Sequence, residues 1–174
     1  MKYFIMDINP NYVSAPQILN GFDEIQKRDL TLRKHENIKK QVLLYVKSHE
    51  EKVFADILTS PFFLMSEKMH RIAKKYEPTM VSKQVALVDK DNQAAELYYL
   101  PILPRIDCIS PQSELNNGKT KFITPVIDPH RTLHKHIFWL KGFNSDLPVI
   151  TLDLAESFLR RDLKGIDLTL MNLE

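Results

Sequence analysis

Cysteine and glycine are scarce in this chain of 174 residues, and long apolar runs are missing. The single cysteine, Cys108, cannot form an intramolecular disulfide, which agrees with a reducing compartment. The four glycines are isolated, so no glycine-rich loop could cradle a phosphate and no flexible linker is indicated. The apolar run from Tyr3 to Met6 is too short for a signal-peptide core, and no run approaches a membrane span. We therefore expect a cytoplasmic protein that does not enter a membrane.

Net charge is also small, at +2 when histidines are neutral. This balance does not by itself demand a nucleic acid or an anionic membrane as partner. Hydrophobic residues make up 44% of the chain and charged residues 26%, which is ordinary for a globular protein. The length suits one domain over residues 1–174, with a core large enough to fold without disulfides.

The stretch from residue 147 to the end of the chain has the clearest pattern. Residues 149–152 form an apolar run of strand length, and Asp153 with Glu156 has the spacing of a reciprocal capping box at a helix start. Gly165 is placed to take the left-handed conformation that ends a helix. From Ile166 onward apolar and polar residues alternate, as in a strand with one buried face. The stretch predicts a strand, a helix and a strand, and the buried helix face would consist of Leu154, Ala155, Phe158, Leu159 and Leu163.

An earlier stretch, residues 62–88, has the same order. Ser66 is a good N-cap, the apolar positions that follow it recur with helical spacing, and Pro78 should close the helix. Residues 84–89 and 96–102 then indicate a β-hairpin. The two strand–helix–strand units suggest a pseudo-repeat.

Further strands are expected at residues 2–6, 41–47, 54–58, 121–128 and 135–141. Residues 11–60 are otherwise hard to assign. The tally of many strands and few helices predicts an α+β fold in one domain, with a mostly antiparallel or mixed sheet that contains the two strand–helix–strand units.

Two places could carry chemistry. If residues 135–141 extend as a strand from the corner at Asp128 to Arg131, His134 and His136 would share one face. They could then bind a metal with His130 or Asp128. The chain has no cysteine pair and no His-Glu-x-x-His motif, so ordinary surface histidines are the competing account. Cys108 could be a thiol nucleophile. Its apolar neighbours instead indicate that Cys108 is buried and acts as a small apolar side chain. A metal-dependent or thiol enzyme is thus one alternative function.

Residues 27–40 are locally basic and could contact an acidic partner or nucleic acid. Acidic residues are interleaved with the cations, which argues against a general nucleic-acid footprint. A nucleic-acid-binding module is therefore a second, less favoured alternative.

Several stretches resemble those of a known protein family, and they are structural motifs rather than catalytic ones. They are Lys2-Tyr-Phe-Ile5, Met65-Ser-Glu-Lys-Met-His70, Tyr99-Leu-Pro-Ile-Leu-Pro-Arg-Ile-Asp-Cys108, Ile137-Phe-Trp-Leu-Lys141, Val149-Ile-Thr-Leu-Asp-Leu-Ala-Glu-Ser-Phe-Leu159 and Leu163-Lys-Gly-Ile166. By these stretches the chain resembles a family of bacterial immunity proteins of polymorphic toxin systems, formerly grouped as a domain of unknown function. The resemblance implies a small cytoplasmic inhibitor that binds a cognate toxin protein, without cofactor, metal or catalytic residues of its own.

Recognition residues are most often found on loops and corners, and interface anchors are often aromatic or arginine. We therefore predict partner-binding residues at Arg105 and Asp107, in the proline-bounded segment 103–111, and at Asp128 and His130, at the following corner. The identity of the toxin, the oligomeric state and the order of strands do not follow from the sequence.

Overall fold

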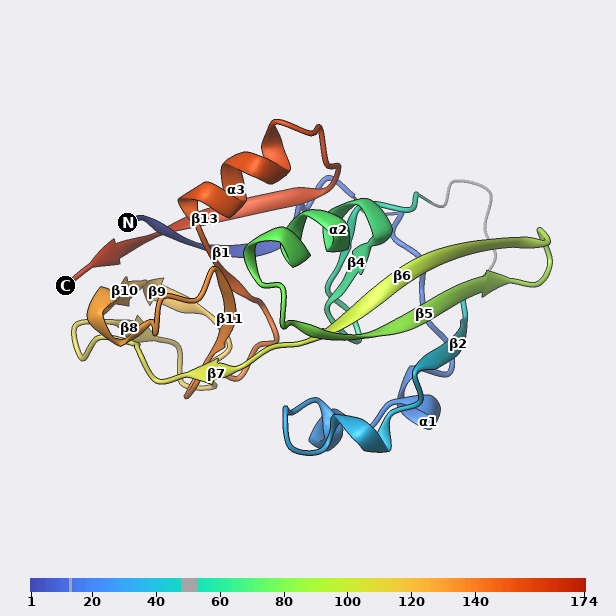
Figure 1. The fold of residues 1–174 in the computed structure, drawn as a ribbon, viewed down its shortest axis with the longest axis horizontal. Helices are drawn as coiled ribbons and strands as arrows, with labels where there is room; N and C mark the ends of the chain where they lie inside the picture. The colour runs from blue at the N-terminus through green and yellow to red at the C-terminus, as the bar shows by residue number, and fades with distance from the viewer. Residues whose placement is uncertain (13, 48–52) are drawn as a thin grey trace.

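The computed structural model describes residues 1–12, 14–47 and 53–174 (Figure 1). The helices are α1 (Gly21–Glu24), α2 (Glu67–Tyr76) and α3 (Leu152–Leu159), with short 3-10 turns at Lys27–Asp29, His35–Asn37 and Pro129–Arg131. The strands are β1 (Tyr3–Ile8), β2 (Gln41–Tyr45), β3 (Ile57–Leu58), β4 (Leu64–Ser66), β5 (Val81–Asp89), β6 (Ala94–Ile102), β7 (Arg105–Ile106), β8 (Glu114–Leu115), β9 (Phe122–Thr124), β10 (Val126–Ile127), β11 (Ile137–Leu140), β12 (Val149–Thr151) and β13 (Ile166–Leu173).

Within this described part of the chain the strands form two mixed sheets and a small hairpin of β8 and β9. One sheet has the order β2-β5-β6-β4-β3, and the other has the order β10-β13-β1-β12-β11-β7. This arrangement confirms the predicted α+β class with mixed sheets.

The five strands of the first sheet correspond to five of the six strands of the second, and β7 has no counterpart. In the first sheet, β6 lies between β4 and β5 and is antiparallel to both, and α2 connects β4 to β5 in the chain. At the edges, β2 pairs parallel to β5, and β3 pairs antiparallel to β4. In the second sheet, β1 lies between β12 and β13 and is antiparallel to both, and α3 connects β12 to β13 in the chain. Here β10 pairs parallel to β13, and β11 pairs antiparallel to β12. The predicted pseudo-repeat is therefore present as a repeated topology. In the second unit the central strand is β1, from the opposite end of the chain.

The two units are joined through their helices, which lie on the same side of the molecule (Figure 1). The Tyr76 hydroxyl, at the end of α2, donates to the carbonyl oxygen of Asp153, near the start of α3, at 3.2 Å and also contacts the Ser157 hydroxyl. Lys68, at the start of α2, reaches the carbonyl oxygen of Arg161, just past the end of α3. The helices are therefore antiparallel. One cluster of buried side chains spans both sheets, including Met6 and Trp139 from one and Leu44, Val85 and Leu100 from the other.

The sequence predicted α2 well. Ser66 caps it by accepting a hydrogen bond from the Met69 amide at 3.2 Å, and the helix ends at Tyr76, two residues before Pro78. The predicted hairpin is also present, as β5 and β6. The predicted strand at 54–58 is reduced to Ile57–Leu58, because residues 53–56 lie outside the ladder.

The predicted details of α3 were wrong in three respects. Its N-cap is Thr151, without a side-chain hydrogen bond, so Asp153 and Glu156 form no capping box and Asp153 lies in the first turn. The helix ends at Leu159 rather than near Gly165, although Gly165 does adopt a positive φ of 83°. Leu159, which was predicted on the buried face of the helix, is 57% exposed.

No helix in the described ranges is long and apolar enough to span a membrane.

Candidate functional site

The two predicted recognition segments meet in space, although about twenty residues separate them in the chain. Arg131 forms an ion pair with Asp107 at 3.3 Å, and the Asp128 amide donates to the carbonyl oxygen of Cys108 at 2.9 Å. An isolated β-bridge between Ile109 and Ile127 continues this pairing. We call the resulting surface the charged corner, and it consists of Arg105, Asp107, Asp128, His130 and Arg131.

Arg105 is held in place on two sides. Its guanidinium lies 5.1 Å from the ring centroid of Trp139, which is 1% exposed, and donates to Asp146 at 2.8 Å. Asp146 also pairs with Lys27 at 3.4 Å. The Asp107 carboxylate likewise forms two ion pairs, with Arg131 at 3.3 Å and with Lys141 at 3.7 Å. Asp146 and Asp107 thus each pair with two cations, so negative and positive side chains alternate along this surface.

A groove of about 410 Å³ opens beside Arg105. It is lined by Lys27, Arg105, Gly142, Phe143, Asn144 and Asp146. The groove is polar along most of its wall, and it is large enough to accept side chains of a partner. It adjoins the charged corner through Arg105.

Asp128 and His130 have different roles. Asp128 caps the turn at Pro129–Arg131 by accepting from the His130 amide at 2.9 Å, and the Thr132 hydroxyl closes that turn onto the Pro129 carbonyl at 3.0 Å. The His130 side chain is exposed and makes no hydrogen bond among the described residues. Asp128 therefore shapes the corner, and His130 is presented from it.

Cys108 lies directly beneath the charged corner and is fully buried. Burial is the main cause that raises the pKa of its thiol to about 12; Arg131 acts in the opposite direction, and Asp107 and Asp128 raise the pKa further. Because the thiolate is the nucleophile, a buried thiol with this pKa is inert at neutral pH. This geometry does not support the thiol chemistry considered for Cys108.

The prediction that His134 and His136 lie on one face of a strand was wrong. Strand β11 begins at Ile137, and His134 lies in a turn with φ of 55°. His136 Nδ1 is 3.0 Å from the Thr151 hydroxyl, and its ring packs edge-on against Tyr76. Across residues 1–12, 14–47 and 53–174, no group of three or more histidine, cysteine or carboxylate side chains is arranged to hold a metal ion.

A serine–histidine contact was missed by the sequence analysis. His70 Nε2, on α2, lies 2.7 Å from the Ser82 hydroxyl, on β5, and the imidazole stacks on Tyr99 with centroids 3.9 Å apart. In the part of the chain that is described, His70 makes no further hydrogen bond that would orient it as a catalytic base requires. No sequence signal links these residues, because only the packing of α2 on the sheet brings them together.

As far as the described residues show, some cations of the basic segment 27–40 form ion pairs and the others have no carboxylate partner. Lys27 pairs with Asp146, and Lys39 pairs with Glu24 at 3.1 Å. The other cations are exposed: Arg28, Arg33, Lys34 and Lys40. The nucleic-acid alternative stays a prediction.

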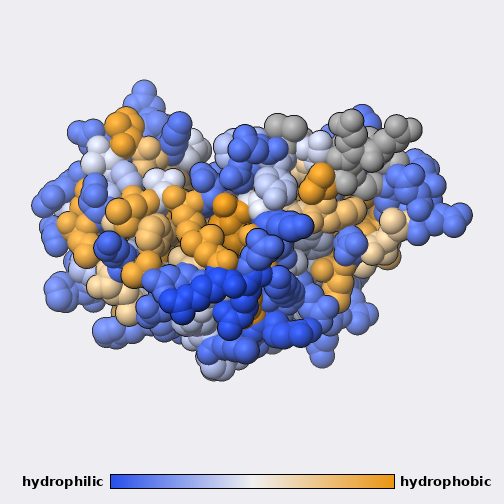
Figure 2. Space-filling model, turned by 90° about the horizontal axis from the view of Figure 1, so that it is seen from above, coloured by the Kyte–Doolittle hydropathy of each residue, from blue (hydrophilic) through white to orange (hydrophobic). Residues whose placement is uncertain are grey.

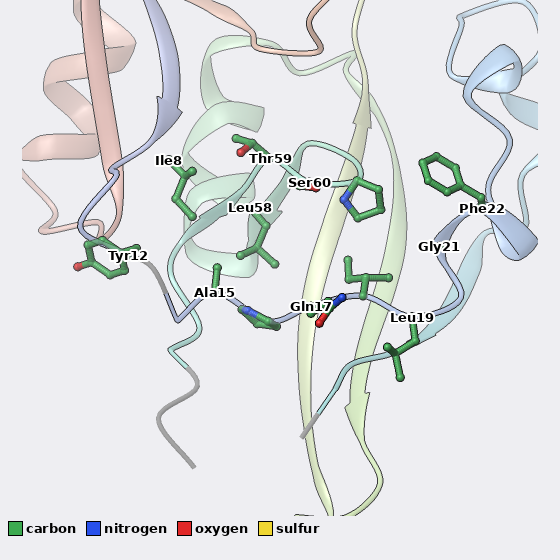
Figure 3. A pocket seen from close by; sticks show the side chains of 13 residues that line it. Ile8, Tyr12, Ala15, Gln17, Leu19, Gly21, Phe22, Leu58, Thr59 and Ser60 are labelled. Atoms are coloured by element: carbon green, nitrogen blue, oxygen red, sulfur yellow. The ribbon is translucent and has the colours of Figure 1, made fainter. Parts of the chain in front are cut away.

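A second groove of about 410 Å³ lies between the chain around residues 8–22 and residues 58–61 (Figure 3). Its side chains come mainly from apolar residues, including Ile8, Leu19, Phe22 and Leu58. Gly21 is required at its rim, because a Cβ there would lie 2.9 Å from Pro61 Cγ. Among the described residues that line the groove, the Tyr12 hydroxyl is the one ionisable side-chain group, and they include no acid–base pair.

Comparison with models of protein families finds no match to this chain. A search of curated proteins also finds no match.

Proposed function

We propose that the protein is a non-enzymatic inhibitor that binds and neutralises a cognate bacterial toxin domain, and that the charged corner is its binding surface. The observation that carries the proposal is the joining of the two recognition segments by the Asp107–Arg131 ion pair and by the hydrogen bond between Cys108 and Asp128. A surface that is built before binding loses little conformational freedom when a partner docks, which favours tight association.

Arg105 has the features of an interface anchor. It is 39% exposed, stacks on a buried tryptophan and is oriented by Asp146. Arginine and aromatic residues are enriched among the side chains that contribute most to protein–protein binding. The groove beside Arg105 offers a place for a complementary side chain of the toxin.

The arrangement of ionisable groups supports binding rather than chemistry. Asp107 and Asp146 are engaged in ion pairs, Asp128 caps a turn, and the Cys108 thiol is buried beneath them. An immunity-type role needs a rigid, complementary surface and no reactive group of its own.

The test is co-expression with the candidate toxin. The C-terminal domain of the protein encoded immediately upstream is expressed in cells with and without this chain. We expect this chain to restore growth and to co-purify with the toxic domain. The charge-swapped variant Arg105→Glu/Asp107→Lys should weaken binding by roughly 30-fold or more, since loss of an interface anchor costs about 2 kcal/mol or more.

A matched control uses the same exchange of charges at the β5–β6 turn. Lys90→Glu/Asp91→Lys leaves the net charge unchanged at the far end of the hairpin and should retain full rescue (Figure 1). Toxicity without rescue would contradict the proposed function. Rescue that is equally strong with the Arg105/Asp107 variant, confirmed as folded by circular dichroism, would contradict the assignment of the surface.

A further inference from the structure

A cavity of about 150 Å³ lies where the first sheet meets β11 of the second. Its walls come from the chain just after α2, from the start of β5 and the end of β6, and from residues 103–104, 135 and 137. Four of the lining side chains are almost completely buried: Met80, Ile102, Leu103 and Ile137. Leu32, from the segment 27–40, also lines the cavity and is 51% exposed. The cavity therefore has an apolar floor, and its more exposed residues mark its mouth.

The walls of this cavity are fixed by hydrogen bonds. Lys74 Nζ donates to the carbonyl oxygens of Pro78, at 2.6 Å, and Met80, at 3.0 Å, which holds the loop after α2 in place. The Trp139 amide donates to the Pro104 carbonyl at 2.9 Å, which holds residues 103–104 against β11. A ligand would therefore enter a site that is already formed and would lose little free energy in ordering it.

An ion pair belongs to the lining of the cavity. Glu77 and Lys135 both line it, and Lys135 Nζ lies 2.9 Å from Glu77 Oε2. Glu77 is 8% exposed, and its other oxygen accepts from the His136 amide at 2.8 Å. A carboxylate accepts up to about four hydrogen bonds and an ammonium donates up to about three, so within the described part of the chain both groups have capacity to spare. The pair can therefore take a further cation at Glu77 and a further anion at Lys135.

The volume of the cavity limits the size of a ligand. Figure 2 shows a face of the molecule on which hydrophilic and hydrophobic residues are interspersed, and an open face of this kind sets no such limit. A cavity of about 150 Å³ accepts an apolar group about the size of benzene. The side chains of leucine, isoleucine, methionine and phenylalanine are in this range, whereas a long acyl chain is too large.

We infer that the cavity binds a free α-amino acid with an apolar side chain, of the size of leucine or phenylalanine. The side chain occupies the space beside Met80, Ile102 and Ile137. The α-ammonium group binds Glu77, and the α-carboxylate binds Lys135. One carbon carries both charged groups of the amino acid, so they can lie side by side against an ion pair whose charges are 2.9 Å apart.

Ligands with a single charge match only half of this site. A fatty acid would place its carboxylate beside Glu77 as well as Lys135, and an aliphatic amine would place its ammonium beside Lys135 as well as Glu77. A zwitterion satisfies both groups, which favours an amino acid over either. The cavity shares no lining residue with the charged corner, so the inference does not depend on the toxin-binding proposal.

Isothermal titration calorimetry of the full chain with L-leucine and with L-phenylalanine measures this binding directly. We expect saturable binding of one molecule per chain, with a Kd below about 1 mM for at least one of the two. Two analogues of leucine each lack one charged group, since isocaproate has no ammonium and isoamylamine has no carboxylate. Each should bind about tenfold or more weakly than leucine, because one charge-assisted contact is lost. The bound amino acid should also raise the melting temperature, because it binds the folded chain.

Two variants test the placement of the ligand. Lys135→Met, at a side chain that is 37% exposed, should weaken leucine binding by about tenfold or more and should not weaken binding of isoamylamine. Val81→Phe fills the cavity from the start of β5 and should weaken binding of both. The matched control Lys39→Met removes the ammonium of an exposed ion pair, with Glu24 at 3.1 Å, and should keep the leucine affinity within about twofold.

Circular dichroism shows which variants are folded. Absence of binding for both amino acids at up to about 10 mM would overturn the inference. Isocaproate or isoamylamine that binds as tightly as leucine would overturn the choice of a zwitterion. An unchanged leucine affinity in a folded Lys135→Met or Val81→Phe variant would overturn the assignment of the cavity.

Discussion

His70 shows how one side chain is controlled by its surroundings. Its ring stacks on Tyr99 and contacts the Ser82 hydroxyl, so it is only partly accessible to water. Burial, followed by the nearby charge of Lys74, lowers the pKa of His70 below its ordinary value of 6.5, and Glu67 opposes this shift. The neutral imidazole is therefore the form that the folded protein favours.

The lowered pKa of His70 should make the folding stability of the protein depend on pH. Because the folded pKa lies below the unfolded one, the contribution of His70 is fully present above pH 6.5 and is lost as pH falls through the folded pKa. We expect His70→Phe, which keeps a ring against Tyr99, to reduce the loss of thermal stability between about pH 7 and pH 5. Melting temperatures measured across this range check it. Substitution of the exposed His134 by Asn should leave the pH dependence unchanged, and an equally steep profile in His70→Phe would contradict the assignment.

At the scale of elements, the two equivalent helices begin in different ways. Thr151 precedes α3 without a capping side-chain bond, whereas Ser66 caps α2 through the Met69 amide and also donates to Asp56. Asp56 in turn accepts from the Lys164 amide at 2.7 Å, in the segment after α3. Ser66 thus stabilises the start of one helix and its connection to the other unit.

Loss of this cap should be measurable. Ser66→Ala removes the acceptor of the Met69 amide and one donor to Asp56, and we expect it to lower the free energy of unfolding by about 1–2 kcal/mol. That corresponds to a melting temperature lower by roughly 2–8 °C for a chain of this length. Ser145, which makes no side-chain hydrogen bond in the described part of the chain, provides the matched Ser→Ala control. Equal melting temperatures for Ser66→Ala and the wild type would show that the cap contributes nothing.

At the scale of the whole molecule, the second unit is a permuted version of the first. In the first unit the central strand β6 follows β5 directly, whereas in the second β1 occupies that position from the other end of the chain. Residues near both ends pair with each other, since Tyr3 lies opposite Met171, and both termini lie on one side of the molecule (Figure 1). A short link between them would restore in the second unit the chain order of the first.

We therefore expect a circular permutant to fold. Residue 174 is joined to residue 1 by a short Gly/Ser linker, and new ends are opened between Asn117 and Gly118, in the exposed turn after β8. All strand pairs of the two sheets are kept, so the melting temperature should stay within about 10 °C of the wild type. Opening the chain instead between Ile72 and Ala73, buried in α2, should prevent folding. Thermal unfolding by circular dichroism measures both, and an unfolded 117/118 permutant would contradict the prediction.

Local rules predicted the elements whose boundaries are set by their own residues. Ser66 and Pro78 delimit α2 because a cap and a proline act within one turn, and the polar residues 89–93 mark the hairpin turn for the same reason. The positive φ of Gly165 was also predictable, and a Cβ there would lie 2.6 Å from Ala55 Cβ. The end of α3 was not, because Asp162, with φ of 53°, turns the chain before Gly165.

The sequence by itself determined the α+β class, the two strand–helix–strand units and the solvent-facing corners where recognition was sought, because periodicity, capping and turn residues act over a few positions. Only the tertiary structure decided that β1 lies inside the second unit, and that Asp107 and Arg131 form one surface. It also decided that Glu77 and Lys135 line one cavity together with Leu32. These arrangements depend on which apolar faces pack together across the whole chain, and local spacing carries no record of that choice.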